Sequence, residues 1–357
     1  MTLVTLVCSD LYLNTVINMA FAIQVKKENA EKLRKLLLKL NLIDFTHLPS
    51  SNKEFIFFPI QKSINVKIQN ELIEKFNVNF VKKRMKRKKQ EKFSLPAFDM
   101  IGDIVIFEIP KEFKDKTEDE KREVAVKIAE NILKQHKNIR LVAMKTGGVS
   151  GPYRIRKFEV ILSRGDSSTV TIHKEHGCRF KIDVAKAYYS PRLSYERRRI
   201  NNLVKDGETV FVPFAGVGPF AIIIAKSHPK CIVYANELNP DAYKYLEENI
   251  RLNKLSNVIP IPGDARDLSK NYKNKADRVV MPLPMSSDQF LDVAFSLAKK
   301  NCVVHFYYFT NSISAAENVV KEAAERFNKK IEILGSRLVR EYSPEIIEVV
   351  VDFKVID

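Results

Sequence analysis

The chain has 357 residues, of which 45% are hydrophobic, so it can form two or three domains with cores of their own. Its 60 Lys and Arg against 43 Asp and Glu give a formal charge of +17, which favours a polyanionic partner such as RNA or DNA. Four scattered cysteines without a CxxC pair, and no apolar run of the ~20 residues in a membrane span, argue against a disulfide framework, a thiolate zinc site and a membrane anchor, and favour the cytoplasm.

The first 80 residues are predicted to form a small α/β domain. Residues 21–25 alternate as a strand, residues 26–43 place leucines on one stripe of a helix, and residues 54–60 form a second strand. Residues 1–18 are mildly apolar but are interrupted by polar side chains and lack a signal-peptide pattern. We interpret them as an extension, with Met19 as an alternative start.

Residues 81–94 are predicted to be a basic linker. Lysines and arginines crowd this stretch without apolar periodicity, which is typical of a flexible or partly helical segment. Phosphate groups are the natural partners of such side chains, and the alternative is a linker that is merely solvated. We expect RNA contacts from Lys82, Lys83 and Arg84.

Two further domains are expected. Residues 95–184 contain a strand at 98–110, a helix at 119–136 and later strands with glycine turns, a pattern that predicts an α+β unit with an antiparallel sheet. From residue 185 to 357, apolar strands alternate with helices, which predicts an α/β fold with a doubly wound parallel sheet. The final pair of strands, joined by a short turn, should add an antiparallel edge.

The first strand of the third domain runs into a glycine turn. Apolar residues 210–214 precede Gly216 and Gly218, and Pro219 suits the first position of a helix. In a doubly wound sheet, a ligand binds at the carboxyl ends of the strands, at the topological switch point. The turn is therefore a candidate ligand site.

Two acidic residues follow the next strands. Glu237 ends the second strand, where a carboxylate can accept hydrogen bonds from two ribose hydroxyls, and Asp264 ends the third, where it could reach an adenine amino group. Neither the full GxGxxG fingerprint of dinucleotide sites nor a GxxxxGK[ST] phosphate loop is present. Adenosine without a phosphate fits better, and S-adenosylmethionine is such a ligand. The expected cofactor contacts are Phe214, Ala215, Gly216, Val217, Gly218, Glu237, Leu238, Asp264, Ala265, Pro282 and Pro284.

Six motifs together resemble the archaeal and eukaryotic tRNA (guanine-37-N1)-methyltransferases, and the resemblance extends from about residue 21 to the C-terminus. They are GPYR (151–154), KAYYSPRLSYERRRI (186–200), PFAGVGPF (213–220), ELNPDAYKYLEENIRLNKL (237–255), GDARD (263–267) and PLP (282–284). The resemblance implies a class I, Rossmann-like methyltransferase domain, a central domain beside it, and a mobile N-terminal domain that checks the tRNA body. It also implies S-adenosylmethionine as methyl donor, and the purine 3′ of the anticodon, in tRNA-Phe, as acceptor. We expect a monomer that requires no metal.

The resemblance also implies roles for individual residues. Glu196 matches the family's general base, and Arg154 matches the residue that steadies the purine O6. Tyr188, Arg192 and Arg197 match positions that line the target pocket or hold the backbone of the flipped nucleotide. From the residues alone, Glu196 could instead pair with nearby arginines on a solvated helix, and Arg154 could contact a phosphate.

Two positions depart from the family pattern. Val212-Pro213 stands where many members carry an acid before the glycine turn, so one hydrogen bond to the cofactor is expected to be missing or supplied elsewhere. Pro282-Leu283-Pro284 stands where guanine-specific members carry Asn-Leu-Pro, and we expect Pro282 at the catalytic centre. This triplet resembles the archaeal branch that also methylates C7 of the tricyclic wyosine intermediate imG-14 (4-demethylwyosine), which implies a dual activity.

Several alternatives remain at this point. The same fold could methylate guanosine 37 alone, or transfer the aminocarboxypropyl group of the cofactor in wyosine synthesis. A non-catalytic RNA-binding protein would not bind S-adenosylmethionine, and a nicotinamide dehydrogenase is disfavoured by the missing fingerprint.

Overall fold

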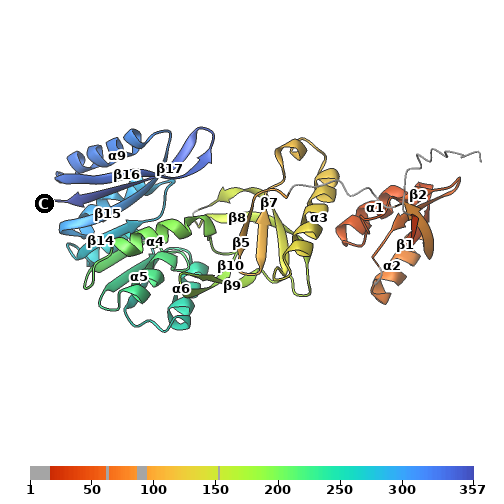
Figure 1. The fold of residues 1–357 in the computed structure, drawn as a ribbon, viewed down its shortest axis with the longest axis horizontal. Coiled ribbons are helices and arrows are strands. Elements are labelled where there is room, and N and C mark those ends of the chain that lie inside the picture. The colour runs from red at the N-terminus through yellow and green to blue at the C-terminus, as the bar shows by residue number, and fades with distance from the viewer. Residues whose placement is uncertain (1–16, 62–63, 87–94, 152) are drawn as a thin grey trace, which may run out of the picture. The chain divides into compact units, whose positions relative to one another are not determined.

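The computed structural model describes residues 17–61, 64–86, 95–151 and 153–357 (Figure 1). Most of the predicted extension and residues 87–94 of the predicted linker lie outside these ranges. The chain divides into two compact units. The first takes the described residues up to Pro96 together with Ile109–Ile132, and the second takes Ala97–Glu108 and Leu133–Asp357.

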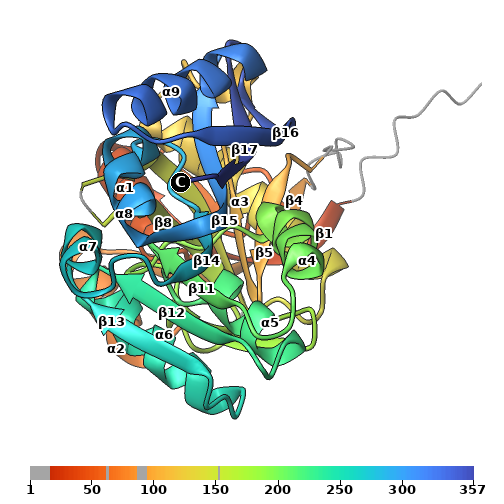
Figure 2. The same ribbon diagram turned by 90° about the vertical axis from the view of Figure 1, so that its left-hand side faces the viewer.

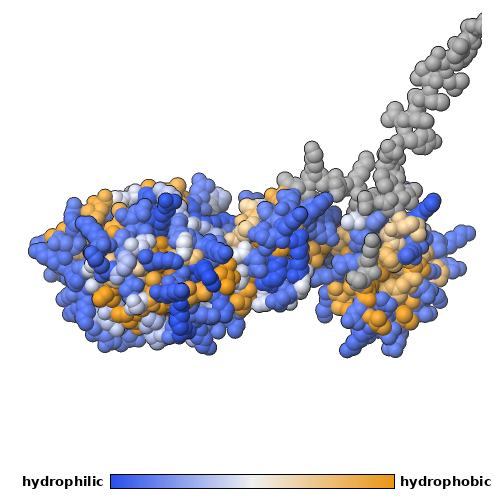
Figure 3. Space-filling view, turned by 60° about the horizontal axis from the view of Figure 1, so that its bottom comes forward, coloured by the Kyte–Doolittle hydropathy of each residue, from blue (hydrophilic) through white to orange (hydrophobic). Residues whose placement is uncertain are grey.

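The first unit contains an antiparallel four-stranded sheet in the order β2-β3-β1-β4. Its strands are β1 (Ile17–Lys26), β2 (Ser50–Ser51), β3 (Phe55–Pro59) and β4 (Asn79–Lys86). Its helices are η1 (Lys27–Asn29), α1 (Ala30–Lys39), α2 (Val66–Phe76), η2 (Lys111–Phe113) and most of α3 (Glu118–Gln135). An ion pair between Arg34 and Glu123 joins α1 to α3. Hydrophobic side chains gather on one face of the N-terminal sheet-and-helix module in Figure 3.

The prediction of a linker from residue 81 is wrong for its described part. β4 continues to Lys86 and pairs antiparallel with β1 along its whole length. Val81 and Met85 pack on the sheet core, and between them the Lys83 amine lies 3.3 Å from the centre of the Phe57 ring. A lysine whose stem covers apolar surface and whose charge lies over an aromatic face can occupy an inward position, so the alternation of a strand was hidden among basic residues.

The second unit begins with a four-stranded sheet in the order β5-β6-β7-β8. Its strands are β5 (Phe98–Ile101), β6 (Ile104–Phe107), β7 (Leu141–Ser150) and β8 (Ile155–Ser163). The single strand predicted at 98–110 is in fact a hairpin that turns at Gly102, whose φ is 58°. β6 and β7 pair in parallel, so the sheet is mixed rather than antiparallel, because the connection that contains α3 is long enough for a crossover.

A two-stranded ribbon follows, formed by β9 (Val170–Glu175) and β10 (Cys178–Asp183). Side-chain amides of α6 hold its second strand. Asn249 accepts from the Lys181 N–H at 2.7 Å and donates to the Lys181 carbonyl at 3.0 Å and to the Val217 carbonyl at 3.0 Å. Asn253, the residue after α6, accepts from the Arg179 N–H at 2.9 Å and donates to the Arg179 carbonyl at 2.7 Å. The fully buried Asn249 therefore connects the ribbon to the glycine turn.

The last part of the chain forms the predicted doubly wound sheet, in the order β13-β12-β11-β14-β15-β17-β16 (Figure 2). The strands are β11 (Thr209–Pro213), β12 (Ile232–Glu237), β13 (Val258–Pro262), β14 (Ala276–Met281), β15 (Ala298–Thr310), β16 (Ile331–Ser343) and β17 (Ile346–Val355). The helices are η3 (Pro191–Leu193), α4 (Ser194–Leu203), α5 (Pro219–Ser227), α6 (Pro240–Leu252), η4 (Ala265–Asp267), α7 (Leu268–Asn271), η5 (Ser287–Phe290), α8 (Leu291–Leu297) and α9 (Ile313–Arg326). β17 and β16 form the expected antiparallel edge.

Alternate residues of the central strands build two cores. Val210 and Val212 of β11 belong to the cluster that contains α5 and α6 residues, whereas Phe211 belongs to the cluster that contains α8 and α9 residues. In β14, Val280 belongs to the cluster with α5 and α6, and Val279 belongs to the cluster with α8 and α9. A sheet buried on both faces needs such continuous apolar strands. β11 lies between β12 and β14, so the switch point falls at the ends of β11 and β14.

No helix among the described residues is long and apolar enough to cross a membrane.

Candidate active site

The turn between β11 and α5 uses backbone that glycine adopts most readily. Gly216 and Gly218 have φ of 58° and 91°. A Cβ on Gly218 would lie 2.6 Å from Leu246 Cδ1, so this glycine lets α5 pack against α6. A Cβ on Gly216 would meet the Tyr188 carbonyl oxygen at 3.8 Å and nothing nearer. The main chain at Gly216 is therefore open to the approach of a ligand.

Phe214 adopts φ of 64° just before the glycines, which is rare for a bulky side chain. Its ring meets the edge of Phe290, with centroids 4.8 Å apart, and the Arg266 guanidinium lies 4.3 Å from the Phe290 centroid. Backbone strain of this kind gathers at functional sites. The strained turn thus coincides with the predicted cofactor position.

Glu237, the last residue of β12, holds the glycine turn with its carboxylate. Oε2 accepts from the Gly216 N–H and Oε1 accepts from the Asn239 N–H, both at 2.7 Å. Burial raises the pKa of this carboxyl, and the backbone donors partly oppose the rise. Each carboxylate oxygen can accept a further hydrogen bond. The group therefore fits the ribose hydroxyls of an adenosine ligand.

Asp264 caps η4 at the end of the third strand. Its Oδ1 accepts from the Arg266 N–H at 2.8 Å, and its Oδ2 lies 3.1 Å from the Arg266 guanidinium. The preceding Gly263 has φ of 110°, and nothing lies within 4 Å of a Cβ built there. The position beside Gly263 is open, and a contact between Asp264 and an adenine amino group stays a prediction.

The other predicted cofactor residues differ in what they can offer. Ala215, Val217 and Ala265 are buried, so only their main chain could meet a ligand, whereas Leu238 is exposed. Val212-Pro213 is buried and apolar, so neither residue replaces the missing acid.

The end of β14 is a loop poor in hydrogen-bond donors. Pro282 and Pro284 have no N–H, and the Leu283 N–H turns back to the Met281 carbonyl at 2.9 Å. The Pro284 carbonyl accepts from the Phe309 N–H at 2.8 Å, which ties the loop to β15. Backbone carbonyls and pyrrolidine rings thus form the strand end at the switch point.

Glu196 on α4 is a buried carboxylate with two unlike oxygens. Oε2 accepts from Arg199 Nε at 2.8 Å and from the Tyr307 hydroxyl at 3.0 Å. Oε1 is buried without a hydrogen bond, and the half-exposed Arg337 guanidinium lies 3.7 Å away. Glu196 does pair with an arginine of its own helix, as the alternative reading expected, but it is only 2% exposed, so the pair is buried and not solvated. A buried acceptor without a hydrogen bond is unusual in a native protein and calls for a functional explanation.

Arg154 and Glu196 are both tied to the loop after β14. Arg154 donates to Ser286 Oγ at 3.3 Å from a main chain with φ of 54°. The adjacent Ser287 donates to the Tyr307 carbonyl, and the Tyr307 hydroxyl in turn reaches Glu196. The two predicted catalytic side chains are therefore linked, through neighbouring serines, to the strand end that carries Pro282.

Two of the predicted RNA-contacting residues keep accessible surface. Arg192 donates to Asp99 at 2.6 Å while its side chain stays 48% exposed. Tyr188 is partly buried, and the Arg156 guanidinium lies 5.6 Å from the centre of its ring. Direct RNA contact by these residues stays a prediction.

Arg197 does not occupy the position predicted for it. It is 2% exposed and donates to both oxygens of Glu175 at 2.6 Å and to the Ser190 carbonyl at 3.0 Å. Its guanidinium also lies 5.0 Å from the ring centre of Tyr189, whose hydroxyl donates to Glu175 at 2.7 Å. Because its Nε and Nη2 groups bind Glu175 and Ser190 inside the protein, Arg197 joins the ribbon to α4 and is buried where an exposed RNA contact was expected.

Replacing Arg197 with Met should lower the free energy of unfolding by about 3–5 kcal/mol, because Glu175 would stay buried without its partner. Burial tends to raise the pKa of Glu175, but hydrogen bonds from His173, Arg197 and Tyr189 outweigh it and hold the pKa at about 2. The lowered pKa means that this stabilisation is present above pH ~4.5 and is lost as the pH falls towards 2. Urea denaturation at pH 7 and pH 3 measures both effects.

Arg198→Met, at the exposed neighbouring position, is the matched control and should change stability by less than about 0.5 kcal/mol. Equal losses for both variants would contradict the buried pair as the cause.

The three basic residues expected to contact RNA lie on β4 of the first unit. Lys82 and Arg84 are exposed, while Lys83 is half-buried over Phe57. Phosphate contacts by this strand stay a prediction.

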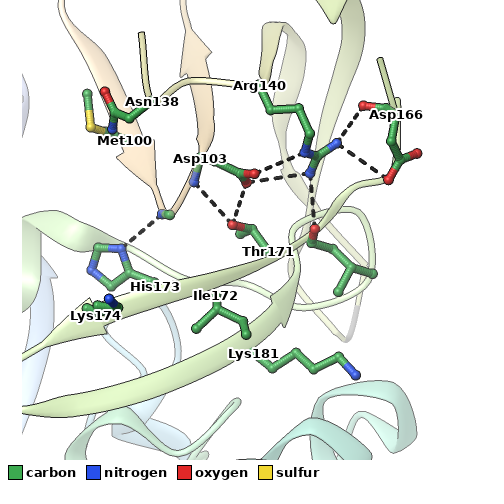
Figure 4. Close-up of a pocket in the computed structure, with 12 residues that line it drawn as sticks. Met100, Asp103, Asn138, Arg140, Asp166, Thr171, Ile172, His173, Lys174 and Lys181 are labelled. Atoms are coloured by element: carbon green, nitrogen blue, oxygen red, sulfur yellow. Dashed lines mark hydrogen bonds and ion pairs between the residues drawn. The ribbon is translucent and has the colours of Figure 1, made fainter. Parts of the chain in front are cut away.

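A hollow of about 740 Å³ lies between the β5–β6 turn and the β9–β10 ribbon (Figure 4). Arg140 at its edge is fully engaged, since it donates to Asp103 at 3.0 Å and to the carbonyls of Asp166, Ser168 and Val170. Gly102 donates to His173, and a Cβ on Gly102 would lie 2.1 Å from Thr171 Oγ1. These contacts fasten the ribbon to the hairpin and leave no charged donor of Arg140 for a ligand.

Sequence reasoning missed several residues that complete the surroundings of Glu196. Only Tyr307 had a sequence signal, because it lies in an aromatic run with His305 at the end of an apolar strand. The partners on β16 and β17 carry no local motif. The missed residues are Arg199, Tyr307, Arg337, Arg340, Glu348 and Asp352.

Three family models match consecutive parts of the chain. The TRM5/TYW2 methyltransferase domain matches residues 171–334, the TYW2 N-terminal domain matches 79–167, and the tRNA methyltransferase 5 N-terminal domain matches 22–68.

Curated relatives match over most of the chain. The tRNA (guanine(37)-N(1))-methyltransferase Trm5b of Pyrococcus abyssi is 37% identical, over 94% of this chain and 99% of that protein. The tRNA(Phe) (4-demethylwyosine(37)-C(7)) aminocarboxypropyltransferase of Methanocaldococcus jannaschii is 37% identical over 72% of this chain and 97% of its own length. The tRNA (guanine(37)-N(1))/4-demethylwyosine(37)-methyltransferase Taw22 of Nanoarchaeum equitans is 31% identical over 63% and 88%.

Solved structures agree with these relatives. The crystal structure of Trm5b from P. abyssi matches with a TM-score of 0.64 at 35% identity, and covers 95% of this chain and all of that one. The complex of aTrm5 with tRNALeu matches with a TM-score of 0.63 at 29% identity, over 94% and 100%. TYW2 of M. jannaschii in complex with AdoMet matches with a TM-score of 0.55 at 32% identity, over 72% and 99%.

Proposed function

This chain belongs to the TRM5/TYW2 methyltransferase family, and we propose that it transfers the methyl group of S-adenosylmethionine to N1 of guanosine 37 in tRNA. The observation that carries the proposal is Glu196, a buried carboxylate with one oxygen held by Arg199 and Tyr307 and the other without a hydrogen bond. The match of residues 22–68 to the Trm5 N-terminal domain, and the coverage of nearly the whole Trm5b chain, support guanosine N1 as the acceptor.

S-adenosylmethionine supplies a methyl carbon that its sulfonium already activates. The open turn at Gly216, the carboxylate of Glu237 and the space beside Gly263 would hold its adenosine part. The protein must then sharpen the nucleophile and place it. Glu196 takes the N1 proton of guanine through Oε1, and Arg154 donates to O6, where negative charge develops as the proton leaves.

The partner that we propose is the anticodon loop of tRNA, with tRNA-Phe as the substrate. The formal charge of +17 supports a polyanionic partner, and the structural relative was solved in complex with tRNALeu. We assign recognition of the tRNA body to the N-terminal domain, with Lys82 and Arg84 on its edge strand, and the chemistry to a monomeric second unit that needs no metal. Extrusion of the stacked purine costs a few kcal/mol, and Tyr188 could hold the extruded base.

Incubation with labelled S-adenosylmethionine and two tRNA-Phe substrates, one with guanosine 37 and one with the tricyclic imG-14 base, tests the proposal. Mass analysis of the nucleosides should show 1-methylguanosine in the first. An aminocarboxypropyl product would assign the chain to the other transfer chemistry of this family. No product, together with no heat of S-adenosylmethionine binding, would leave only RNA binding.

A second activity, methylation of C7 of imG-14, is supported by Pro282. The absence of a donor at this position leaves the rim of the strand end less polar, which suits a base whose nucleophile is carbon. Against it stands the coverage of the relatives, because Taw22 matches a smaller share of the chain at lower identity than Trm5b. Guanosine N1 methylation alone is therefore the better supported reading, and C7 methylation is an additional proposal.

Replacing Pro282 with Asn should shift activity towards guanosine N1, because the new amide can hydrogen-bond the guanine edge and narrows the space for a tricyclic base. The ratio of the initial rates on the two tRNA substrates is the measurement, and a fall of about tenfold in the C7 to N1 ratio is expected, the effect of about 1.4 kcal/mol. Pro284→Ala, two residues further on, is the control. An unchanged ratio in Pro282→Asn would remove Pro282 from substrate selection.

A further inference from the structure

A chain of buried charges extends from Glu196 into the sheet. The Arg199 guanidinium lies between two carboxylates, with Nε 2.8 Å from Glu196 Oε2 and Nη1 2.5 Å from Asp352 Oδ2. These side chains are 13%, 2% and 16% exposed for Arg199, Glu196 and Asp352. One guanidinium is therefore shared, away from water, by the proposed base and a second carboxylate on β17.

His305 holds the far side of Asp352 and must be neutral. Its Nε2 lies 2.7 Å from Arg278 Nη1, and because a guanidinium can only donate, Nε2 accepts. The proton is thus on Nδ1, which donates to Asp352 Oδ1 at 2.6 Å. Burial, above all, lowers the pKa of His305, which agrees with this assignment. Arg278 is in turn anchored by Glu208 at 2.7 Å.

Asp352 carries a full negative charge at neutral pH. Burial tends to raise its pKa, but hydrogen bonds from His305 and Arg199 outweigh it and hold the pKa at about 2. A like charge behind Arg199 has a consequence for Glu196. A guanidinium given wholly to Glu196 would stabilise the carboxylate and weaken it as a proton acceptor, whereas a competing anion offsets this effect.

We propose that Asp352 is a positioning residue that sets how strongly Glu196 takes a proton, by sharing Arg199 with it. This inference rests on the proposed role of Glu196 as the base. The charged and titratable groups around Glu196, from every element packed against it, are Arg199 on α4, His305 and Tyr307 on β15, Arg337 and Arg340 on β16, and Glu348 and Asp352 on β17.

The other groups around Glu196 do not replace Asp352. Arg340 is paired with Glu348 at 2.5 Å, so the two opposite charges largely cancel. Arg337 is 39% exposed, so water screens its charge at 3.7 Å from Oε1. Tyr307 donates without carrying charge, since burial raises its pKa well above the usual value.

The test is the pH dependence of single-turnover methyl transfer to guanosine 37 by Asp352→Asn. The amide keeps the size of the side chain and its oxygen can accept from Arg199, although its NH2 then faces the Nδ1–H of His305, and the competing charge is gone. The acidic limb of the profile should move to lower pH by about one unit. The plateau rate should fall about tenfold, part of the ~10²–10⁴-fold that a positioned base contributes.

Asp277→Asn is the matched control. Asp277 is also a structural carboxylate, which accepts from the Thr209 N–H at 2.8 Å and binds Lys299 at 2.9 Å, at the opposite end of β14 from the loop. Its loss should cost stability without moving the limb. An acidic limb in Asp352→Asn that coincides with wild type, or that moves to higher pH, overturns the proposal.

Two further measurements distinguish a failure of this proposal from misfolding of the variant and from a failure of the proposed function. If Asp352→Asn fails to fold, Arg199→Lys takes its place, because one ammonium cannot bridge both carboxylates. It should lower kcat about tenfold with the KM for tRNA within about twofold, and an unchanged kcat counts against the proposal. ¹³C NMR titration of the Glu196 carboxyl, assigned with Glu196→Gln, compares wild type and Asp352→Asn without turnover. A wild type that makes no 1-methylguanosine refutes the function, whereas equal titrations refute the role of Asp352.

Discussion

Replacing Glu196 with Gln is expected to lower the single-turnover rate of methyl transfer to guanosine 37 by about 10²–10⁴-fold, the usual contribution of a positioned general base. The amide oxygen of Gln can still accept from Arg199 and Tyr307, so the buried geometry survives. The group that replaces Oε1 cannot take the N1 proton. Transfer of label from S-adenosylmethionine to a guanosine 37 transcript measures the rate.

Glu325→Gln, at an exposed position on α9, is the matched control for this change and should keep the wild-type rate. Binding of S-adenosylmethionine, followed by calorimetry, should be unchanged in both variants, since Glu196 is not among the groups expected to hold the cofactor. A rate for Glu196→Gln within about tenfold of wild type would show that another group removes the proton.

Replacing Arg154 with Ala should reduce kcat by about 10²–10³-fold, the usual loss when one donor to a developing oxyanion is removed. Arg154 is tethered to Ser286 beside the strand end, and its proposed role at O6 requires a donor at the moment when charge builds. The alternative role, a phosphate contact, predicts a different signature. A phosphate contact would raise the KM for tRNA and leave kcat nearly unchanged.

Ser286→Ala provides the control for Arg154, because it removes the tether but keeps the guanidinium, and it should cost less than about tenfold. Steady-state kinetics with varied tRNA separate kcat from KM for each variant. Loss confined to KM in Arg154→Ala would assign the residue to the RNA backbone.

The order of the third domain could be predicted from sequence because its signals are local. The strand that ends at Pro213, the glycine turn, and the acid at Glu237 all occupy the expected places. Apolar runs bounded by glycine and proline describe a strand and its end without knowledge of the neighbours. The hairpin at Gly102 was missed because its two strands are short and apolar on both sides of the turn.

The active-site surroundings show where sequence reasoning ends. Arg197, Arg198 and Arg199 are consecutive, yet a helix turns about 100° per residue and sends them in three directions. Arg197 binds Glu175, Arg198 is exposed, and Arg199 bridges Glu196 to Asp352, which is 153 residues away along the chain. Charge and spacing are the same for all three, so only the packing partners distinguish an RNA contact from a structural or catalytic one.

The amides of Asn249 and Asn253 have a practical consequence for anyone who dissects this enzyme. A fragment that begins at the predicted boundary near residue 185 would lack the ribbon. The side chains of Asn249 and Asn253 would then lose their hydrogen-bond partners, which are main-chain groups of β10. The fully buried Asn249 would keep its hydrogen bond to the Val217 carbonyl but lose both bonds to Lys181. The glycine turn that contains Val217 would therefore be held less firmly. A catalytic fragment that keeps its shape must start upstream of Val170, the first residue of β9.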